Sequence, residues 1–236
     1  MNLILENWTQ SDMQNFNLYL QSIAKPEKVN WTRRIINTSL PLYAIPTPEI
    51  KIIAKEILKG DYLSFLKLNT RLVYENLAVN AFLIANIADF ELQKSFLLPY
   101  ASIVDCWALC DILKFKVNKN NVDDFFKLSM QLIKSEKVFV RRIAIIIWFE
   151  LFKFEDYLDN VYAFIPNLKS ENEYYVNMCL AWFVAEGFIK ARQKSLKLFE
   201  ENVLNDFVTN KAIQKCRDSF RVDPKDKEML LKFKRK

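Results

Sequence analysis

The sequence predicts an all-α protein built as an α-solenoid, in which short helical pairs stack one on the next. Apolar residues recur at spacings of three and four along nearly the whole chain, and no segment alternates with a period of two. Among the 236 residues only Gly60 and Gly187 are glycines, which disfavours tight β-turns. A short motif also recurs about 35 residues apart (169 − 134). These observations together predict a curved superhelix of helices with a basic concave face.

The expected helices are separated by residues that interrupt helical structure. In chain order the breaks are Pro41, Pro46 and Pro48, then Gly60-Asp61, Pro99, Asn118 to Asn121, Pro166-Asn167 and Asp223-Pro224. No stretch rich in serine or glycine resembles a linker between domains. We therefore expect residues 1–236 to form a single domain.

An internal repeat supports the solenoid. Lys134-Ser135-Glu136 precedes VRRIA at 140–144, and Lys169-Ser170-Glu171 precedes VNMCL at 176–180, an offset of 36 (176 − 140). Weaker echoes surround ENLA at 75–78, DCW at 105–107 and NKAI at 210–213. This period fits two short helices with their turns, as in HEAT-like repeats. Equivalent positions of successive repeats would lie side by side, so distant residues could meet on the inner helices.

Four residues on these inner helices form the candidate site. Trp107 and Asp111 lie four residues apart and so share one helical face. Arg142 interrupts an apolar stripe in the next repeat, and Trp182 follows one repeat later. Two aromatic rings, an anion and a fixed cation suit the handling of a cationic intermediate on an anionic polymer.

Each of these residues also has a structural interpretation. A tryptophan in an apolar helix is commonly a core residue. Asp111 and Arg142 could form an ion pair between adjacent repeats, because a buried charge needs a partner. Arg141, close to Lys137, is the better candidate for a solvated side chain or for a contact with phosphate.

Charge and composition narrow the chemistry. The formal net charge is +6, and three basic clusters favour contact with nucleic acid, although each alone could be a solvated helix face. The clusters are Lys190, Arg192, Lys194 and Lys197; Lys211, Lys215, Arg217 and Arg221; and the tail 232–236. The chain has no histidine, which excludes Ser-His-Asp triads and imidazole catalysis. The shortage of glycine disfavours phosphate-binding loops.

The cysteines and the N-terminal segment indicate a cytoplasmic protein. Cys106, Cys110, Cys179 and Cys216 are expected to be reduced, buried thiols. Cys106 and Cys110 share a helical face, but no further cysteine or histidine completes a metal site, so no metal or cofactor is expected. The start MNLILENWTQ does not look like a signal peptide, and apolar runs such as 143–149 are too short to cross a membrane.

The motifs, their order and their spacing resemble the bacterial DNA alkylation repair proteins of the AlkD type, over roughly residues 20 to 225. The matching segments are DCWALCD at 105–111, FVRRIAI at 139–145 and residues 174–182. YAIPTPE at 43–49 resembles the family's early turn, and AIQK at 212–215 its last repeat. Two positions depart from the family pattern: Ala44 replaces a glycine of the early turn, and Cys106 stands where some relatives have a tryptophan.

The resemblance implies a function. These HEAT-like-repeat glycosylases remove positively charged alkylated purines from duplex DNA. Asp111 falls at the catalytic aspartate, Trp107 and Trp182 at the aromatic residues around the lesion, and Arg142 at an arginine that holds the DNA backbone. With Arg141 and Lys211 as further DNA contacts, we expect a monomeric, monofunctional glycosylase for 3-methyladenine and 7-methylguanine. The alternative is a non-catalytic module that binds DNA structures or a protein, as some members of the wider family do.

Overall fold

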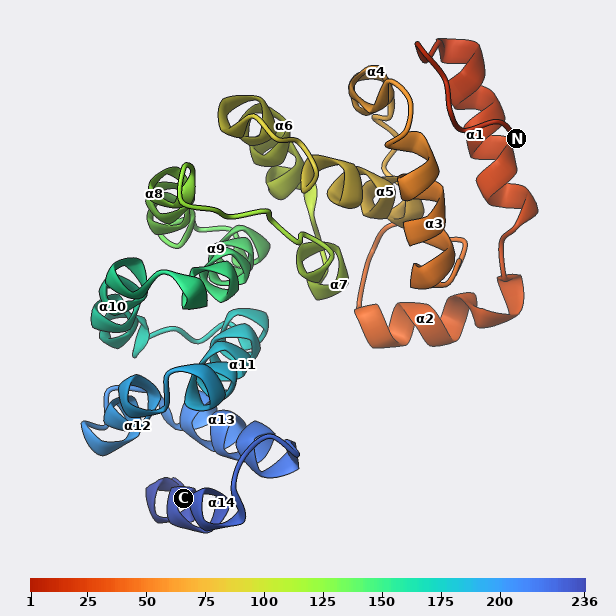
Figure 1. Cartoon of the computed structure of the whole chain (residues 1–236). Helices are drawn as coiled ribbons and strands as arrows, with labels where there is room; N and C mark the ends of the chain where they lie inside the picture. The colour runs from red at the N-terminus through yellow and green to blue at the C-terminus, as the bar shows by residue number, and fades with distance from the viewer. The chain divides into compact units, whose positions relative to one another are not determined.

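The computed structural model describes all residues, 1–236, and helices are its only regular secondary structure (Figure 1). It has fourteen α-helices and no strand, and 69% of the residues are helical. The prediction of an all-α helical-repeat fold is therefore confirmed. By their internal contacts the residues group into two compact units, Met1–Lys116 and Val117–Lys236. The single domain and the basic concave face stay predictions.

The first unit is organised around α5, which is buried along almost its whole length. Helices α3, α4, α6 and α7 all contact α5, and α1 contacts α4. The helices of this unit are α1 (Gln10–Ser22), α2 (Val29–Ile36), α3 (Thr47–Ile57), α4 (Tyr62–Leu68), α5 (Tyr74–Ile84), α6 (Phe90–Ile103) and α7 (Trp107–Asp111). Helix α7 is therefore held against the most buried helix of its unit.

The second unit is a regular stack in which α9, α11 and α13 contact one another in succession. Its helices are α8 (Val122–Leu132), α9 (Val138–Glu150), α10 (Glu155–Phe164), α11 (Tyr174–Lys190), α12 (Arg192–Glu200), α13 (Asp206–Asp218) and α14 (Pro224–Leu230). Helices α9 and α11 begin 36 residues apart (174 − 138), which is the predicted period.

Hydrogen bonds between successive repeats of this unit follow the same period. Tyr162 and Ser195, 33 residues apart, join their hydroxyl groups at 2.6 Å in the interior. Lys169 Nζ donates to the carbonyl of Asn202, also 33 residues away, at 2.7 Å. Because the partners occupy similar places in neighbouring repeats, these hydrogen bonds stabilise the packing of one repeat on the next. The predicted internal repeat is thus confirmed in this unit.

Most of the predicted helix breaks are confirmed, but the break at Pro99 is wrong. Pro99 lies inside α6, which continues to Ile103. A proline removes one backbone hydrogen bond and normally ends or kinks a helix. Here the residues on both sides of it are anchored, because Leu97 and Tyr100 are buried and Tyr100 Oη donates to the carbonyl of Leu109 at 2.9 Å. Tertiary packing therefore carries the helix through the proline.

The early turn that departs from the family pattern adopts a conformation that favours glycine. Ala44 has a φ of 58°, in the left-handed region. The buried carboxylate of Glu75 accepts hydrogen bonds from the backbone N–H groups of Tyr43, at 3.0 Å, and Ile45, at 3.3 Å. Burial raises the pKa of Glu75 above its ordinary value, and these backbone donors oppose the rise. Glu75 thus clamps the turn from both sides of Ala44.

We expect Ala44→Gly to leave the stability unchanged or to raise the free energy of unfolding by up to about 1 kcal/mol. Relief of left-handed strain, worth about 1–2 kcal/mol, is partly offset by the entropy of the unfolded glycine and by the loss of a buried methyl group. The control is Ala163→Gly in α10, which should cost about 1 kcal/mol because Ala163 lies in an ordinary helix. Urea unfolding measures both; equal destabilisation by the two changes would contradict this account.

The cysteines are buried as predicted, and burial raises the pKa of Cys106 and of Cys216 to about 12. No group of three or more histidine, cysteine or acidic side chains is arranged to hold a metal ion. None of the helices combines the length and apolar character that crossing a bilayer requires.

Candidate functional site

Helix α7 carries the first two candidate residues. It is only five residues long, with Trp107 at its first position and Asp111 at its last. Both side chains are half-buried, while Leu109 and Cys110 between them are fully buried. The predicted placement of Trp107 and Asp111 one turn apart on a single helix is confirmed. The middle of α7 is therefore buried in the core, while the two candidate residues at its ends stay partly exposed.

The tryptophan is fixed by the last turn of α2. Trp107 Nε1 donates a hydrogen bond to the backbone carbonyl of Ile35, 72 residues earlier, at 3.2 Å. This bond joins the start of α7 to the end of α2, within the same unit. A tryptophan whose indole N–H is occupied in this way has a defined ring orientation.

Asp105, two residues before α7, ties the same two segments together. Its carboxylate accepts hydrogen bonds from the Thr38 hydroxyl at 2.7 Å, the Ser39 backbone N–H at 2.7 Å and the Ser39 hydroxyl at 2.8 Å. Arg33 in turn closes this segment by donating to the carbonyls of Thr38 and Leu40, both at 2.9 Å. Helix α7 is too short to hold its own position, so these long-range bonds position it.

The sequence alone predicts no role for Asp105. The one local signal is its place directly before an expected inner helix, where acidic residues commonly act as caps. Its actual partners lie 66 and 67 residues earlier in the chain. No periodicity in the sequence points to them.

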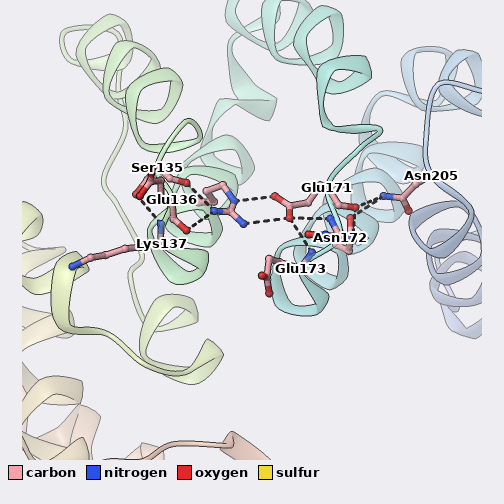
Figure 2. Close-up of polar contacts among 9 residues, drawn as sticks. Ser135, Glu136, Lys137, Glu171, Asn172, Glu173 and Asn205 are labelled. Atoms are coloured by element: carbon pink, nitrogen blue, oxygen red, sulfur yellow. Dashed lines mark hydrogen bonds and ion pairs between the residues drawn. The ribbon is translucent and has the colours of Figure 1, made fainter.

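In the second unit, Arg141 joins two repeats. Its Nε and Nη2 atoms donate to the two carboxylate oxygens of Glu171 at 2.8 and 3.2 Å, and Nη1 donates to the carbonyls of Ser135 and Glu136 (Figure 2). The two side chains are only 13% and 8% exposed. Glu171 also accepts the backbone N–H groups of Asn172 and Glu173 at the start of α11. These contacts favour a structural role for Arg141, whose contact with phosphate stays a prediction.

Arg142 and Trp182 lie on α9 and α11, as predicted. Arg142 is 5% exposed, and its Nη1 donates to the backbone carbonyl of Tyr175 at 2.6 Å. Trp182 is half-buried, and its ring lies 4.4 Å from that of Phe149 at 46°. Arg142 is thus hydrogen-bonded, and Trp182 is packed against another ring, within the second unit. The convergence of both with Trp107 and Asp111 involves the two units together and stays a prediction, as does the Asp111–Arg142 ion pair.

The predicted basic clusters differ in their surroundings. In the first cluster, all four cations form ion pairs: Lys190 with Glu186, Arg192 with Asp226, Lys194 with Glu155 and Asp159, and Lys197 with Glu201. Arg221 of the second cluster pairs with Glu186. Lys211 forms no ion pair, and its Nζ donates to the side chain of Gln214 at 3.2 Å. The uncompensated positive charge therefore lies at α13 rather than at α12.

Comparison with known proteins identifies a family whose sequence model covers these residues. The sequence model of a family described as DNA alkylation repair enzyme matches residues 17–215, most of the chain. A search among curated proteins finds no match. The matched range includes α7, α9, α11 and most of α13, and so all of the candidate residues. The chain therefore belongs to the family of DNA alkylation repair enzymes.

Proposed function

We propose that this protein is a monofunctional DNA glycosylase that hydrolyses the N-glycosidic bond of positively charged alkylated purines in duplex DNA. Membership of the alkylation repair family supports the substrate class. The observation that carries the proposal is α7, which presents a carboxylate and an anchored indole one turn apart at the edge of a buried core. No cofactor is needed for this reaction, and we expect the protein to act as a monomer in the cytoplasm.

This hydrolysis needs few catalytic groups. A purine alkylated at N3 or N7 is cationic and already a good leaving group, so the main task is to stabilise an oxocarbenium-like sugar. The Asp111 carboxylate would supply negative charge beside that sugar and orient the attacking water. The faces of Trp107 and Trp182 would attract the cation, by about 0.5–2 kcal/mol each. Arg142 would bind a neighbouring phosphate, with Arg141 and Lys211 as further proposed contacts.

The test is to incubate the protein with methylated duplex DNA and to measure the bases released. Free 3-methyladenine or 7-methylguanine, together with abasic sites in the DNA and no strand cleavage, is the expected result. Binding to the DNA with no base released would instead indicate the non-catalytic alternative. Absence of both binding and release would leave a protein partner as the ligand.

We expect Asp105→Ala to slow base release by about tenfold or more through its effect on α7. Loss of the bonds to Thr38 and Ser39 loosens the helix that holds Trp107 and Asp111, and small misplacements of catalytic groups are costly. Single-turnover rates at saturating enzyme measure the effect, and Asp105→Asn, which keeps one acceptor oxygen, should restore part of the rate.

A double-variant comparison separates positioning from general destabilisation. In an Asp111→Asn background, Asp105→Ala should slow base release much less than it does in the wild type, because there is no catalytic carboxylate left to misplace. Equal factors in both backgrounds would show that Asp105 does not act through Asp111.

A further inference from the structure

A pocket between α13 and α14 gathers basic side chains from three separate segments. Its volume is about 630 Å³. The cations that line it are Lys211 and Arg217 from α13, Lys227 from α14 and Lys234 from the C-terminal tail. We propose that this pocket binds phosphate groups of the DNA backbone and so extends the DNA contact already proposed for Lys211 to Arg217, Lys227 and Lys234, outside the candidate catalytic residues. The proposal extends the proposed function and rests on DNA being the ligand.

The charge around this pocket differs from that of the neighbouring basic residues. None of its four cations forms an ion pair, whereas the cations of α12 are all matched by carboxylates. Two carboxylates, Asp218 and Glu228, also line the pocket. Cations thus outnumber anions two to one, and the excess positive charge has no partner within the protein. An unmatched cluster of this kind attracts an anionic ligand.

The C-terminal tail is held in place beside the pocket. The ring of Phe233 lies 6.0 Å from that of Phe199. Asn210 and Arg235 exchange two hydrogen bonds: the Arg235 backbone N–H donates to Asn210 Oδ1 at 2.9 Å, and Asn210 Nδ2 donates to the Arg235 carbonyl at 3.2 Å. Lys234 lies between these two anchors, so its backbone is ordered before any ligand binds. Such pre-organisation lowers the entropic cost of binding.

The arrangement suits a polymer of phosphates better than a small anion. Three lysines are point charges that bind phosphate from many directions, and Arg217 adds a planar fork. The pocket is much larger than a single phosphate ion, and its cations come from three separate segments of the chain. Successive phosphates along one DNA strand provide negative charges spaced over such a surface.

The test is the salt dependence of binding to an undamaged, fluorescently labelled duplex. The plot of log K against log salt concentration has a negative slope. In the triple variant Lys211→Gln, Arg217→Gln, Lys234→Gln this slope should be shallower by about 2 or more, since each lost phosphate contact removes about 0.9. The matched control is Lys127→Gln, Lys190→Gln, Lys197→Gln. It removes the same charge from residues already paired with a carboxylate one turn along their helices, and its slope should stay close to that of the wild type. Equal slopes for the two triple variants would overturn the proposal.

A second variant tests the tail. Asn210→Ala removes both hydrogen bonds to Arg235 and keeps every cation. It should weaken DNA binding, but the salt dependence of binding should stay steeper than in the triple variant. Inorganic phosphate serves as a probe for a small-anion site. If phosphate binds at micromolar concentration and the slope for DNA is unchanged in the triple variant, the pocket takes free phosphate and the proposal is wrong.

The outcomes keep this proposal separate from the proposed function. Base release by the wild type together with an unchanged slope in the triple variant would overturn the pocket alone. A reduced slope in a protein that releases no alkylated base would support the pocket and overturn the glycosylase.

Discussion

Replacing Asp111 by asparagine should slow the release of 7-methylguanine or 3-methyladenine by about 100- to 10,000-fold, the usual loss when a positioned acid or base is removed. The substitution keeps the size of the side chain at the end of α7 and takes away the negative charge that would stabilise the oxocarbenium-like sugar. Single-turnover release from methylated duplex DNA at saturating protein measures the loss. Helical content and the affinity for DNA should stay near their wild-type values.

The control for this experiment is Asp156→Asn on α10. Asp156 is exposed and forms no ion pair, so the same chemical change there should leave the rate of base release unaltered. A wild-type rate for Asp111→Asn would exclude a catalytic role for this carboxylate. A variant that is slow only because it no longer binds DNA would also contradict the mechanism, since the charge is proposed to act on the sugar rather than on the affinity.

Removing the carboxylate of Glu171 should destabilise the second unit by about 3–5 kcal/mol, the usual cost of leaving one partner of a buried ion pair alone. Glu171→Ala would leave the nearly buried guanidinium of Arg141 without its anion. It would also leave the N–H groups of Asn172 and Glu173 without their acceptor. The shift of the urea midpoint of the chain, followed by circular dichroism, measures the change.

A double-variant cycle separates the loss of the ion pair from the loss of the acceptor for the backbone N–H groups. Arg141→Met with Glu171→Leu removes both charges and should be less destabilising than Glu171→Ala, because no unpaired charge stays buried. Glu171→Gln, which keeps an acceptor for the backbone, should lie between the wild type and Glu171→Ala. Additive effects in the cycle would show that the two side chains are not coupled and that the ion pair does not hold the repeats together.

Periodicity and helix-breaking residues were sufficient to predict most of this fold. Apolar spacing of three and four predicts helices, and the repeat of about 36 residues reappears as the interval between the starts of α9 and α11. The error at Pro99 has a physical cause, since the packing of Leu97 and Tyr100 outweighs the local preference of proline. The departure at Ala44 was visible in the sequence, but the left-handed conformation it must adopt was not.

The candidate site was predictable in part. Spacing alone placed Trp107 and Asp111 on one helix, because positions four apart share a face. The sequence could not distinguish Arg141 from its neighbour Arg142 by partner, since the partners lie 30 and 33 residues further along the chain. It also could not separate matched from unmatched lysines, because adjacent basic residues in a sequence look alike whether or not a carboxylate of another repeat faces them.

By itself the sequence determined the helical class, the repeat period, the kinds of side chain available for chemistry and the family. The first three follow from composition and from spacing along one chain, whereas the family follows from the resemblance of the motifs and from the family model that matches residues 17–215. Only the tertiary structure decided that Asp105 and the end of α2 position α7, that Glu171 neutralises Arg141, and that the unpaired cations gather between α13 and α14. Hydrogen bonds and ion pairs act over a few ångströms, and in a repeat protein the residues within that distance come from segments tens of residues apart.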